Sequence, residues 1–444
     1  MNPTVEETAA PSSRATERPS SPEEVHAPRS GRVLCAAVAV IVVTAIIALG
    51  TVTEIYLRAT KHFFYNGDYE YDPDLGWRFL PGARFVYRAW EIATPVAIDD
   101  SGFRALPSGA TDAPFRVAIL GDSFTSNLAV RDEEVFTARM AELLRPGHAV
   151  HGLRTQGWQV SNLGVNGYGT VQEFLLYERL ARSGSHFDLV IVNLYGLNDF
   201  DDNVLAQLWV WGRRRPRLVA RGDGEVSFTD LPVPYAPLTE FWGFLQDHSA
   251  VVRQLLTLAQ ARRAVEVPAG WPYPPSLVGT PAVLRYGVSD PPPPALAAER
   301  ATVRLLGRLR DATADRRTPL LVALAPSLFD LDPEYRHAAG EWLTRELGWR
   351  LDDSEPWGRV QSQLQAEGIA VCNLVPALED RTPAALYHPR ELHWTPEANA
   401  IVADLLAAAV VAVERGEPPP DHTVQGRTCL GLTSLFHSRQ MERY

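Results

Sequence analysis

Short apolar runs alternate with amphipathic stretches through most of this chain. Five runs are apolar enough to be buried strands, over residues 116–120, 159–163, 189–194, 320–325 and 369–374. Stretches with helical spacing of apolar positions lie between and after them, over residues 134–144, 170–182, 297–315, 357–366 and 396–412. This alternation predicts an α/β fold in which helices cover both faces of a parallel sheet. Such a sheet binds its ligands beyond the carboxyl ends of its strands.

A longer apolar run lies near the N-terminus. Val33–Thr53 contains 21 residues without a charge, and a helix of that length spans about 30 Å, the thickness of a bilayer core. We therefore expect a transmembrane helix over residues 33–57. A cleaved signal peptide and a buried helix are the alternatives, but the polar segment before the run is long and no clear A-x-A cleavage site follows. Positive side chains flank both ends, and of the two orientations we favour the one with the short tail inside and the large domain outside.

Other segments depart from the alternation. Residues 1–32 are rich in Pro and Ser and predict a disordered tail. Residues 58–113 are aromatic and turn-rich, which predicts short strands and loops leading into a main domain over 114–414. Residues 415–444 predict an irregular tail.

The main domain contains an insertion over residues 203–294. A helix is expected there over Glu240–Arg263. The insertion also contains Trp209, Trp211, Trp242 and Trp271. These side chains suit hydrophobic packing, and they also suit stacking on a sugar, so the insertion could cover part of a binding site.

Charge and cysteine content exclude several classes of protein. The net charge of −11 makes the chain a poor partner for a phosphate backbone, so we expect no nucleic-acid binding. Cys35, Cys372 and Cys429 are too few for a disulfide framework, and none lies in a C-x-x-C motif. Cysteine usage therefore does not identify the redox compartment.

Candidate chemistry gathers where the predicted strands end. The first strand runs directly into Gly121-Asp122-Ser123, which puts a serine at a strand-to-helix turn, although a helix-capping serine would give the same local pattern. The second strand is followed by a glycine-rich turn that includes Gly167, and the third by Asn198. His393 lies just before the last helix. Because the carboxyl ends of parallel strands meet at one edge of a sheet, we expect these residues to converge.

This ordered set resembles the SGNH, or GDSL-type, hydrolase superfamily. The resemblance covers about residues 114–414 and implies a three-layer α/β/α flavodoxin-like domain. It also implies Ser123 as the nucleophile, His393 as the base, and an oxyanion hole from Ser123, Gly167 and Asn198. The family often has Asp three residues before the His, where this chain has Arg390. Glu391 is the available carboxylate, and E-L-H-W is similar to the D-x-H-W of relatives that include envelope polysaccharide O-acetyltransferases.

The resemblance implies acyl transfer through a serine ester. We expect a membrane-anchored serine esterase that hydrolyses a small acyl ester, which could be an acetyl group on an envelope glycan. An O-acyltransferase acting on such a glycan and an inactive glycan-binding or scaffold protein are the alternatives. The sequence has no H-E-x-x-H, G-x-S-x-G, Walker A or dinucleotide-binding motif, so we expect neither a metal nor a cofactor.

Overall fold

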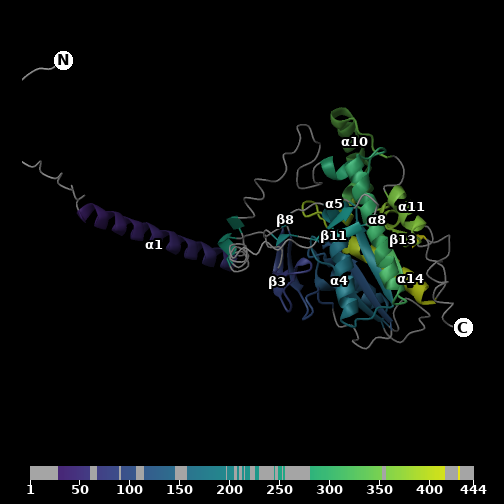
Figure 1. The fold of residues 1–444 in the computed structure, drawn as a ribbon, viewed down its shortest axis with the longest axis horizontal. Helices are drawn as coiled ribbons and strands as arrows, with labels where there is room; N and C mark the ends of the chain where they lie inside the picture. The colour runs from purple at the N-terminus through teal and green to yellow at the C-terminus, as the bar shows by residue number, and fades with distance from the viewer. Residues whose placement is uncertain are drawn as a thin grey trace, which may run out of the picture. The chain divides into compact units, whose positions relative to one another are not determined.

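The computed structural model describes two units of the chain (Figure 1). The described residues are 29–60, 68–89, 92–106, 115–145, 158–196, 198–204, 281–352 and 357–415, with short pieces between 208 and 255 and at 429–430. The first unit is Met1–Thr60 and the second is Lys61–Tyr444. The expected tail over residues 1–32 lies outside the described residues except for its last four, which are helical.

The first unit contains one helix, α1 (Arg29–Thr60), among its described residues. The most apolar stretch within Val33–Ala59 has a mean hydropathy of 2.9, and none of that stretch is buried among the described residues. The helix is long enough to cross a bilayer, and it extends beyond both ends of the expected 33–57 span. A second apolar helix, α14 (Pro396–Arg415), passes the same length and composition criteria, but 61% of its most apolar stretch is buried and it belongs to the core of the second unit.

The second unit is built on a six-stranded sheet in the order β14-β13-β12-β7-β5-β6. Five strands are parallel: β5 (Phe115–Gly121), β6 (Trp158–Asn162), β7 (Leu189–Tyr195), β12 (Leu320–Ala325) and β13 (Ala370–Asn373). They lie where the apolar runs predict strands. The edge strand β14 (Cys429–Leu430) is antiparallel and comes from the tail that we expected to be irregular.

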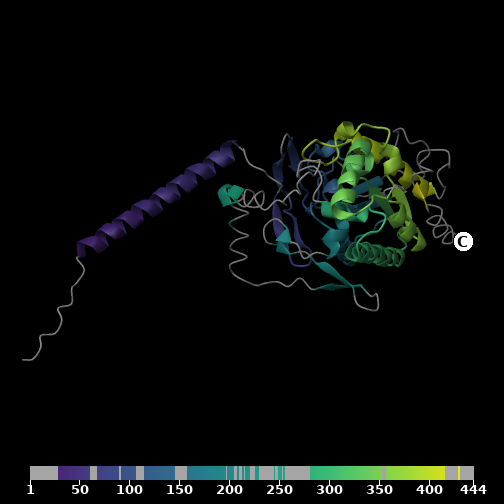
Figure 2. The ribbon, with the colours of Figure 1, turned by 90° about the horizontal axis from the view of Figure 1, so that it is seen from above.

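Helices cover both faces of this sheet, as the alternation predicts. On one face α3 (Phe136–Leu143) packs against α14. On the other, α8 (Pro293–Ala314) contacts both α4 (Thr170–Arg182) and α11 (Gly358–Ala366). Figures 1 and 2 show the sheet between the helices. The remaining short helices are α2 (Ser123–Ser126), η1 (Asp132–Glu134), α5 (Asp199–Val204), η3 (Pro281–Tyr286), α9 (Leu328–Leu331), α12 (Val375–Leu378) and α13 (Pro383–Leu386).

The strand order changes direction at the carboxyl edge of the sheet. From β5 the chain moves to β6 on one side, and then returns to β7 on the other side of β5. Loops that leave β5 and β7 therefore diverge, and ligands bind at such a point in open α/β sheets. Ser123 follows β5 and Asn198 follows β7, so the order of the strands brings both to this edge.

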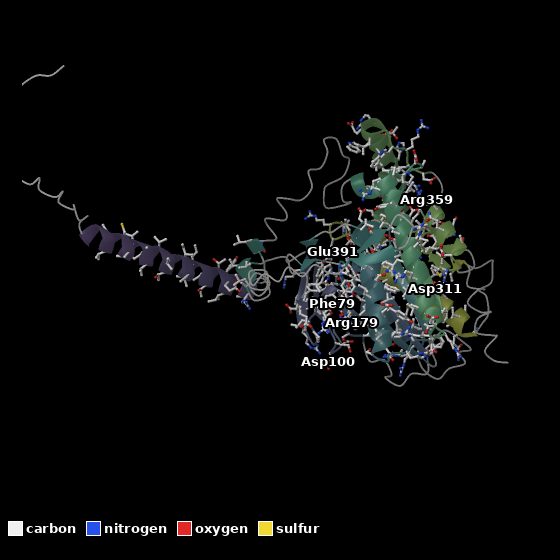
Figure 3. All side chains as sticks on the ribbon, in the orientation of Figure 1. Phe79, Asp100, Arg179, Asp311, Arg359 and Glu391 are labelled. Atoms are coloured by element: carbon white, nitrogen blue, oxygen red, sulfur yellow. The ribbon has the colours of Figure 1, made fainter. Side chains whose placement is uncertain are left out.

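The lead-in forms two antiparallel hairpins that pack into the domain. The first pairs β1 (Tyr69–Asp72) with β2 (Gly76–Phe79), and the second pairs β3 (Arg84–Ala89) with β4 (Ile92–Ala97). Trp77 and Phe79 are almost fully buried in the main hydrophobic core. Arg179 of α4 forms an ion pair of 2.6 Å with the buried Asp72 (Figure 3). The predicted short strands are confirmed, and they are part of the domain rather than a linker to it.

The insertion is described only in part. It contains the short hairpins β8 (Leu208–Trp209) with β9 (Arg213–Arg214) and β10 (Arg217–Ala220) with β11 (Val226–Thr229). Most of the expected helix Glu240–Arg263, together with Trp211, Trp242 and Trp271, lies outside the described residues.

Two further features depart from the sequence pattern. The helix α10 (Pro333–Leu347) was not expected, and it forms a separate small core in which Tyr335 and Leu343 are fully buried. Cys372 in β13 is disulfide-bonded, whereas Cys35 in α1 is free.

Candidate active site

Ser123 lies at a sharp turn between β5 and α2. The Asp122 carboxylate caps α2 by accepting a hydrogen bond of 2.8 Å from the backbone N–H of Phe124. A Cβ at Gly121 would overlap Thr125 Oγ1 and lie 2.9 Å from Thr125 Cβ, so only glycine fits before this turn. The turn leaves Ser123 partly exposed between almost fully buried neighbours.

Three side chains form a continuous hydrogen-bonded relay. Ser123 Oγ lies 2.7 Å from His393 Nε2, and His393 Nδ1 lies 2.6 Å from Glu391 Oε1. An ionised carboxylate can only accept, so Nδ1 carries the proton and Nε2 of the neutral ring accepts from the serine hydroxyl. The structure therefore brings together the predicted nucleophile, base and carboxylate, although Glu391 is two residues before the histidine. Figure 3 labels Glu391.

Glu391 and His393 shift each other's pKa. Burial alone would raise the pKa of Glu391, but the charge and hydrogen bonds of His393 and a hydrogen bond from Tyr87 lower it below its usual value. Burial would lower the pKa of His393, but the Glu391 carboxylate, with a smaller contribution from Asp122, raises it above 6.5. The relay thus favours an ionised Glu391 and makes the imidazole of His393 more basic than usual.

An unusual backbone turn makes the Glu391–His393 contact possible. Leu392, between them, has φ of +69°, a left-handed conformation that non-glycine residues rarely adopt. The loop is closed by His388, which donates its N–H to the His393 carbonyl at 3.0 Å and accepts from the Leu392 N–H at 3.0 Å. Such conformations persist only where the surrounding structure enforces them, and they are concentrated at functional sites.

The turn that contains Gly167 lies beside the nucleophile. Val165 N–H donates to the Gly121 carbonyl at 3.1 Å, which ties this loop to the end of β5. Gly167 has φ of +76°, which favours glycine. Within the part of the chain that the structure describes, neither the Ser123 amide nor the Gly167 amide donates to a protein group. Both amides are thus available to a ligand, and their role in an oxyanion hole stays a prediction.

Asn198 contacts carboxylates in this structure. Its Nδ2 donates to Asp122 at 3.3 Å and to Asp202 at 3.0 Å. Burial raises the pKa of Asp122 to about 6, against hydrogen bonds and the charge of His393, which lower it. Asn198 therefore lies next to the turn that contains Ser123. Its Nδ2 group must give up one of these two hydrogen bonds before it can donate to an oxyanion.

Aromatic rings pack around Phe124, the residue after Ser123. The ring of Phe124 lies 4.0 Å from that of Tyr195, 4.8 Å from that of His393 and 5.2 Å from that of Trp394. Trp394 is fully buried. The base therefore rests on an apolar surface on one side and on Glu391 on the other, which limits its rotation.

Three residues of the lead-in contact this site and were missed from the sequence. Tyr87 donates to Glu391 Oε1 at 2.7 Å. Arg104 donates to the Ser126 carbonyl at 2.6 Å, and Trp77 Nε1 donates to the Asn166 carbonyl at 3.0 Å. None of the three follows a strand of the main sheet, and the only signal is the aromatic, turn-rich composition of their segment.

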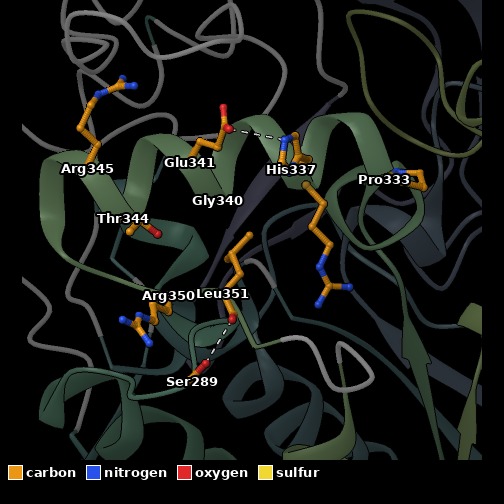
Figure 4. Close-up of a pocket in the computed structure, with 10 residues that line it drawn as sticks. Ser289, Pro333, His337, Gly340, Glu341, Thr344, Arg345, Arg350 and Leu351 are labelled. Carbon is orange, nitrogen blue, oxygen red and sulfur yellow. Dashed lines mark hydrogen bonds and ion pairs between the residues drawn. The ribbon is translucent and has the colours of Figure 1, made fainter.

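A separate cavity of about 980 Å³ lies along α10 and contains none of these residues (Figure 4). Its wall includes Arg336, His337 and Glu341. The described residues contain no group of three or more His, Cys, Asp or Glu side chains that could hold a metal ion.

One known protein family matches part of this chain. Residues 287–430 match the family described as the SGNH hydrolase-like domain of the acetyltransferase AlgX. This segment includes Glu391 and His393 but not Ser123. A search of curated protein sequences finds no match.

Three of the solved structures that are similar to this chain illustrate the extent of the similarity. The acetylxylan esterase Axe2 from Geobacillus stearothermophilus is 13% identical over 67% of this chain and 94% of its own, with a TM-score of 0.33. TesA is 11% identical over 67% and 97%, with a TM-score of 0.30. A putative lipolytic protein of the G-D-S-L family from Desulfitobacterium hafniense is 10% identical over 67% and 98%, with a TM-score of 0.30.

Proposed function

We propose that this protein, whose α/β unit contains an SGNH hydrolase-like domain, is a membrane-anchored serine esterase. The single observation that supports this most is the relay from Ser123 Oγ through His393 to Glu391, with distances of 2.7 and 2.6 Å. These are the distances of a nucleophile with its base and of a base with its orienting group. The substrate we propose is a small acyl ester, with acetyl on an envelope glycan as the first candidate.

The reaction would proceed through an acyl-enzyme. His393 Nε2 takes the proton of Ser123 Oγ while Oγ bonds to the ester carbonyl carbon. The resulting imidazolium is stabilised by the Glu391 carboxylate and then gives its proton to the departing alcohol. The negative charge on the carbonyl oxygen would be met by the amides of Ser123 and Gly167 and, after it exchanges a partner, by Asn198.

The fate of the acyl-enzyme distinguishes hydrolysis from transfer. If His393 activates water, the acid is released; if it activates a sugar hydroxyl, a new ester forms. The family match to a domain described from an acetyltransferase favours O-acyl transfer as the second candidate function. The residues of the relay serve both reactions, so the acceptor must be identified by experiment.

Two features support attachment to a membrane with the large unit outside the cytoplasm. The most apolar stretch of α1 is exposed in the part of the chain that the structure describes, and a bilayer would cover it. Cys372 is disulfide-bonded, and Cys429 is its neighbour in the β13–β14 pairing. Disulfides persist in oxidising compartments, so this bond favours the extracytoplasmic side.

Replacement of the nucleophile tests the proposal. The full-length chain in detergent is assayed for acetate release from an acetyl ester, with and without a glycan acceptor. Ser123→Ala should abolish both release and transfer, whereas Ser183→Ala, an exposed serine at the end of α4, should leave both unchanged. Acetate release that falls as acceptor is acetylated would identify a transferase. Full activity in Ser123→Ala would refute a serine mechanism.

A further inference from the structure

We propose that Tyr87 is a positioning residue for the catalytic carboxylate, which makes the lead-in hairpin a part of the active site. This rests on the proposed serine mechanism and extends it to a residue outside the SGNH motifs. Tyr87 lies on β3, 304 positions before Glu391 in the sequence, and its hydroxyl donates to Glu391 Oε1 at 2.7 Å. This is the oxygen that also accepts from His393 Nδ1.

Glu391 needs an external contact because its side chain is longer than that of aspartate. The extra methylene adds a rotatable bond between the backbone and the carboxylate. One carboxylate oxygen, Oε2, is held by the backbone N–H of His393 at 3.0 Å. Tyr87, on β3, donates to the other oxygen, Oε1. The two contacts together fix the carboxylate in the position that contacts the imidazole of His393.

The surroundings of Tyr87 suit a fixed donor. The side chain is buried, with 6% of the residue exposed, and Glu391 retains 3% side-chain exposure. Burial first, and then the charge of Glu391, raise the pKa of the Tyr87 hydroxyl well above 10, so it stays protonated and can donate. A hydrogen bond to an ionised group in such surroundings is shorter and stronger than a neutral one.

The hairpin that presents Tyr87 is itself attached to the nucleophile side of the site. Thr94 of β4 is the direct register partner of Tyr87, and its hydroxyl donates to the Ala129 carbonyl at 2.9 Å. Ala129 lies three residues after the end of α2. The hairpin thus links the loop after Ser123 to the loop that bears Glu391.

The test compares Tyr87→Phe with Tyr286→Phe in the full-length protein. Each variant removes one hydrogen bond from a tyrosine hydroxyl to a carboxylate, but only the first removes a contact to Glu391, because Tyr286 donates to Asp201. We expect Tyr87→Phe to lower kcat about tenfold, equivalent to about 1.4 kcal/mol, with little change in KM. Tyr286→Phe should keep the wild-type kcat in the folded fraction.

The pH profile separates positioning from a purely structural role. If the carboxylate is no longer held against His393, the pKa of His393 falls and the acid limb of the kcat profile moves to lower pH. An unmoved limb, or one that moves to higher pH, would overturn the proposal. A second measurement uses Glu391→Ala as background, where Tyr87→Phe should cost nothing further because its partner is absent.

The experiments distinguish failure of the Tyr87 proposal from failure of the proposed serine mechanism. If Ser123→Ala abolishes activity while Tyr87→Phe retains the wild-type kcat and pH profile, the serine mechanism stands and the role of Tyr87 is refuted. If Ser123→Ala remains active, both are refuted.

Discussion

The guanidinium of Arg104 supports the loop that follows the nucleophile, and its removal should destabilise the domain strongly. Arg104 is almost fully buried. It donates to the carbonyls of Ser126, Asn127 and Val130 and pairs with Asp132 at 3.0 Å. These carbonyls belong to the end of α2 and to the turn beyond it, so one side chain from the lead-in closes the backbone behind Ser123.

The size of the effect can be worked from these contacts. The Asp132 side chain is 25% exposed, so water can solvate it when Arg104 is lost. The three carbonyls have less access to water, and a buried acceptor left without a partner costs about 1–3 kcal/mol. Because all three share one guanidinium, their costs are not additive. We expect Arg104→Met to lose about 3–5 kcal/mol, as when one partner of a buried ion pair is removed.

Thermal unfolding of the full-length protein in detergent is the assay. In a domain of this size a loss of that magnitude lowers Tm by roughly 10 °C. The matched control is Arg78→Met on β2, whose ion pair with Glu70 is more than a third exposed on both sides and should be worth at most about 1 kcal/mol. Equal melting of the Arg104 and Arg78 variants would refute the idea that the lead-in supports the nucleophile loop.

Three further outcomes are expected. The activity should decline as pH falls through the pKa of His393, which lies above 6.5, since only the neutral ring accepts a proton. Glu391→Gln should lower kcat and move this acid limb of the pH profile to lower pH. A pH-independent rate between pH 5 and 8 would contradict the relay. Gly121→Ala should destabilise the fold by about 1–3 kcal/mol in denaturant unfolding, because its Cβ would collide with Thr125, and wild-type stability would show that the turn can relax. Addition of reductant should lower Tm by opening the Cys372 disulfide, worth about 2–4 kcal/mol, and a titration that finds three free thiols in the untreated protein would exclude that bond.

Much of the sheet could be predicted from sequence because its strands are buried on both faces. Continuous apolar runs identified β5, β6, β7, β12 and β13, and amphipathic spacing gave α4 with its observed bounds. The same reasoning missed β14, since two residues are too short for a periodic signal. It also missed α10, which packs on a small core of its own rather than on the sheet.

Sequence reasoning found the candidate residues that lie next to a regular element of the main domain. Ser123 follows β5 and His393 lies just before α14, so their motifs could be recognised locally. Tyr87 and Arg104 reach the site from a hairpin, and their partners are fixed by tertiary packing across many residues. No local pattern of apolar positions encodes such contacts.

The substitution of glutamate for aspartate before the histidine follows from the same geometry. A longer carboxylate directly before a tight turn would sample several rotamers, and a mobile carboxylate could not hold one imidazole tautomer. Here the left-handed turn at Leu392 brings Glu391 and His393 to the same side of the loop, and Tyr87 binds the carboxylate from the hairpin. The extra methylene is therefore accommodated by a contact that the lead-in supplies, and the proposed role of Tyr87 makes this hairpin and the main sheet one functional unit.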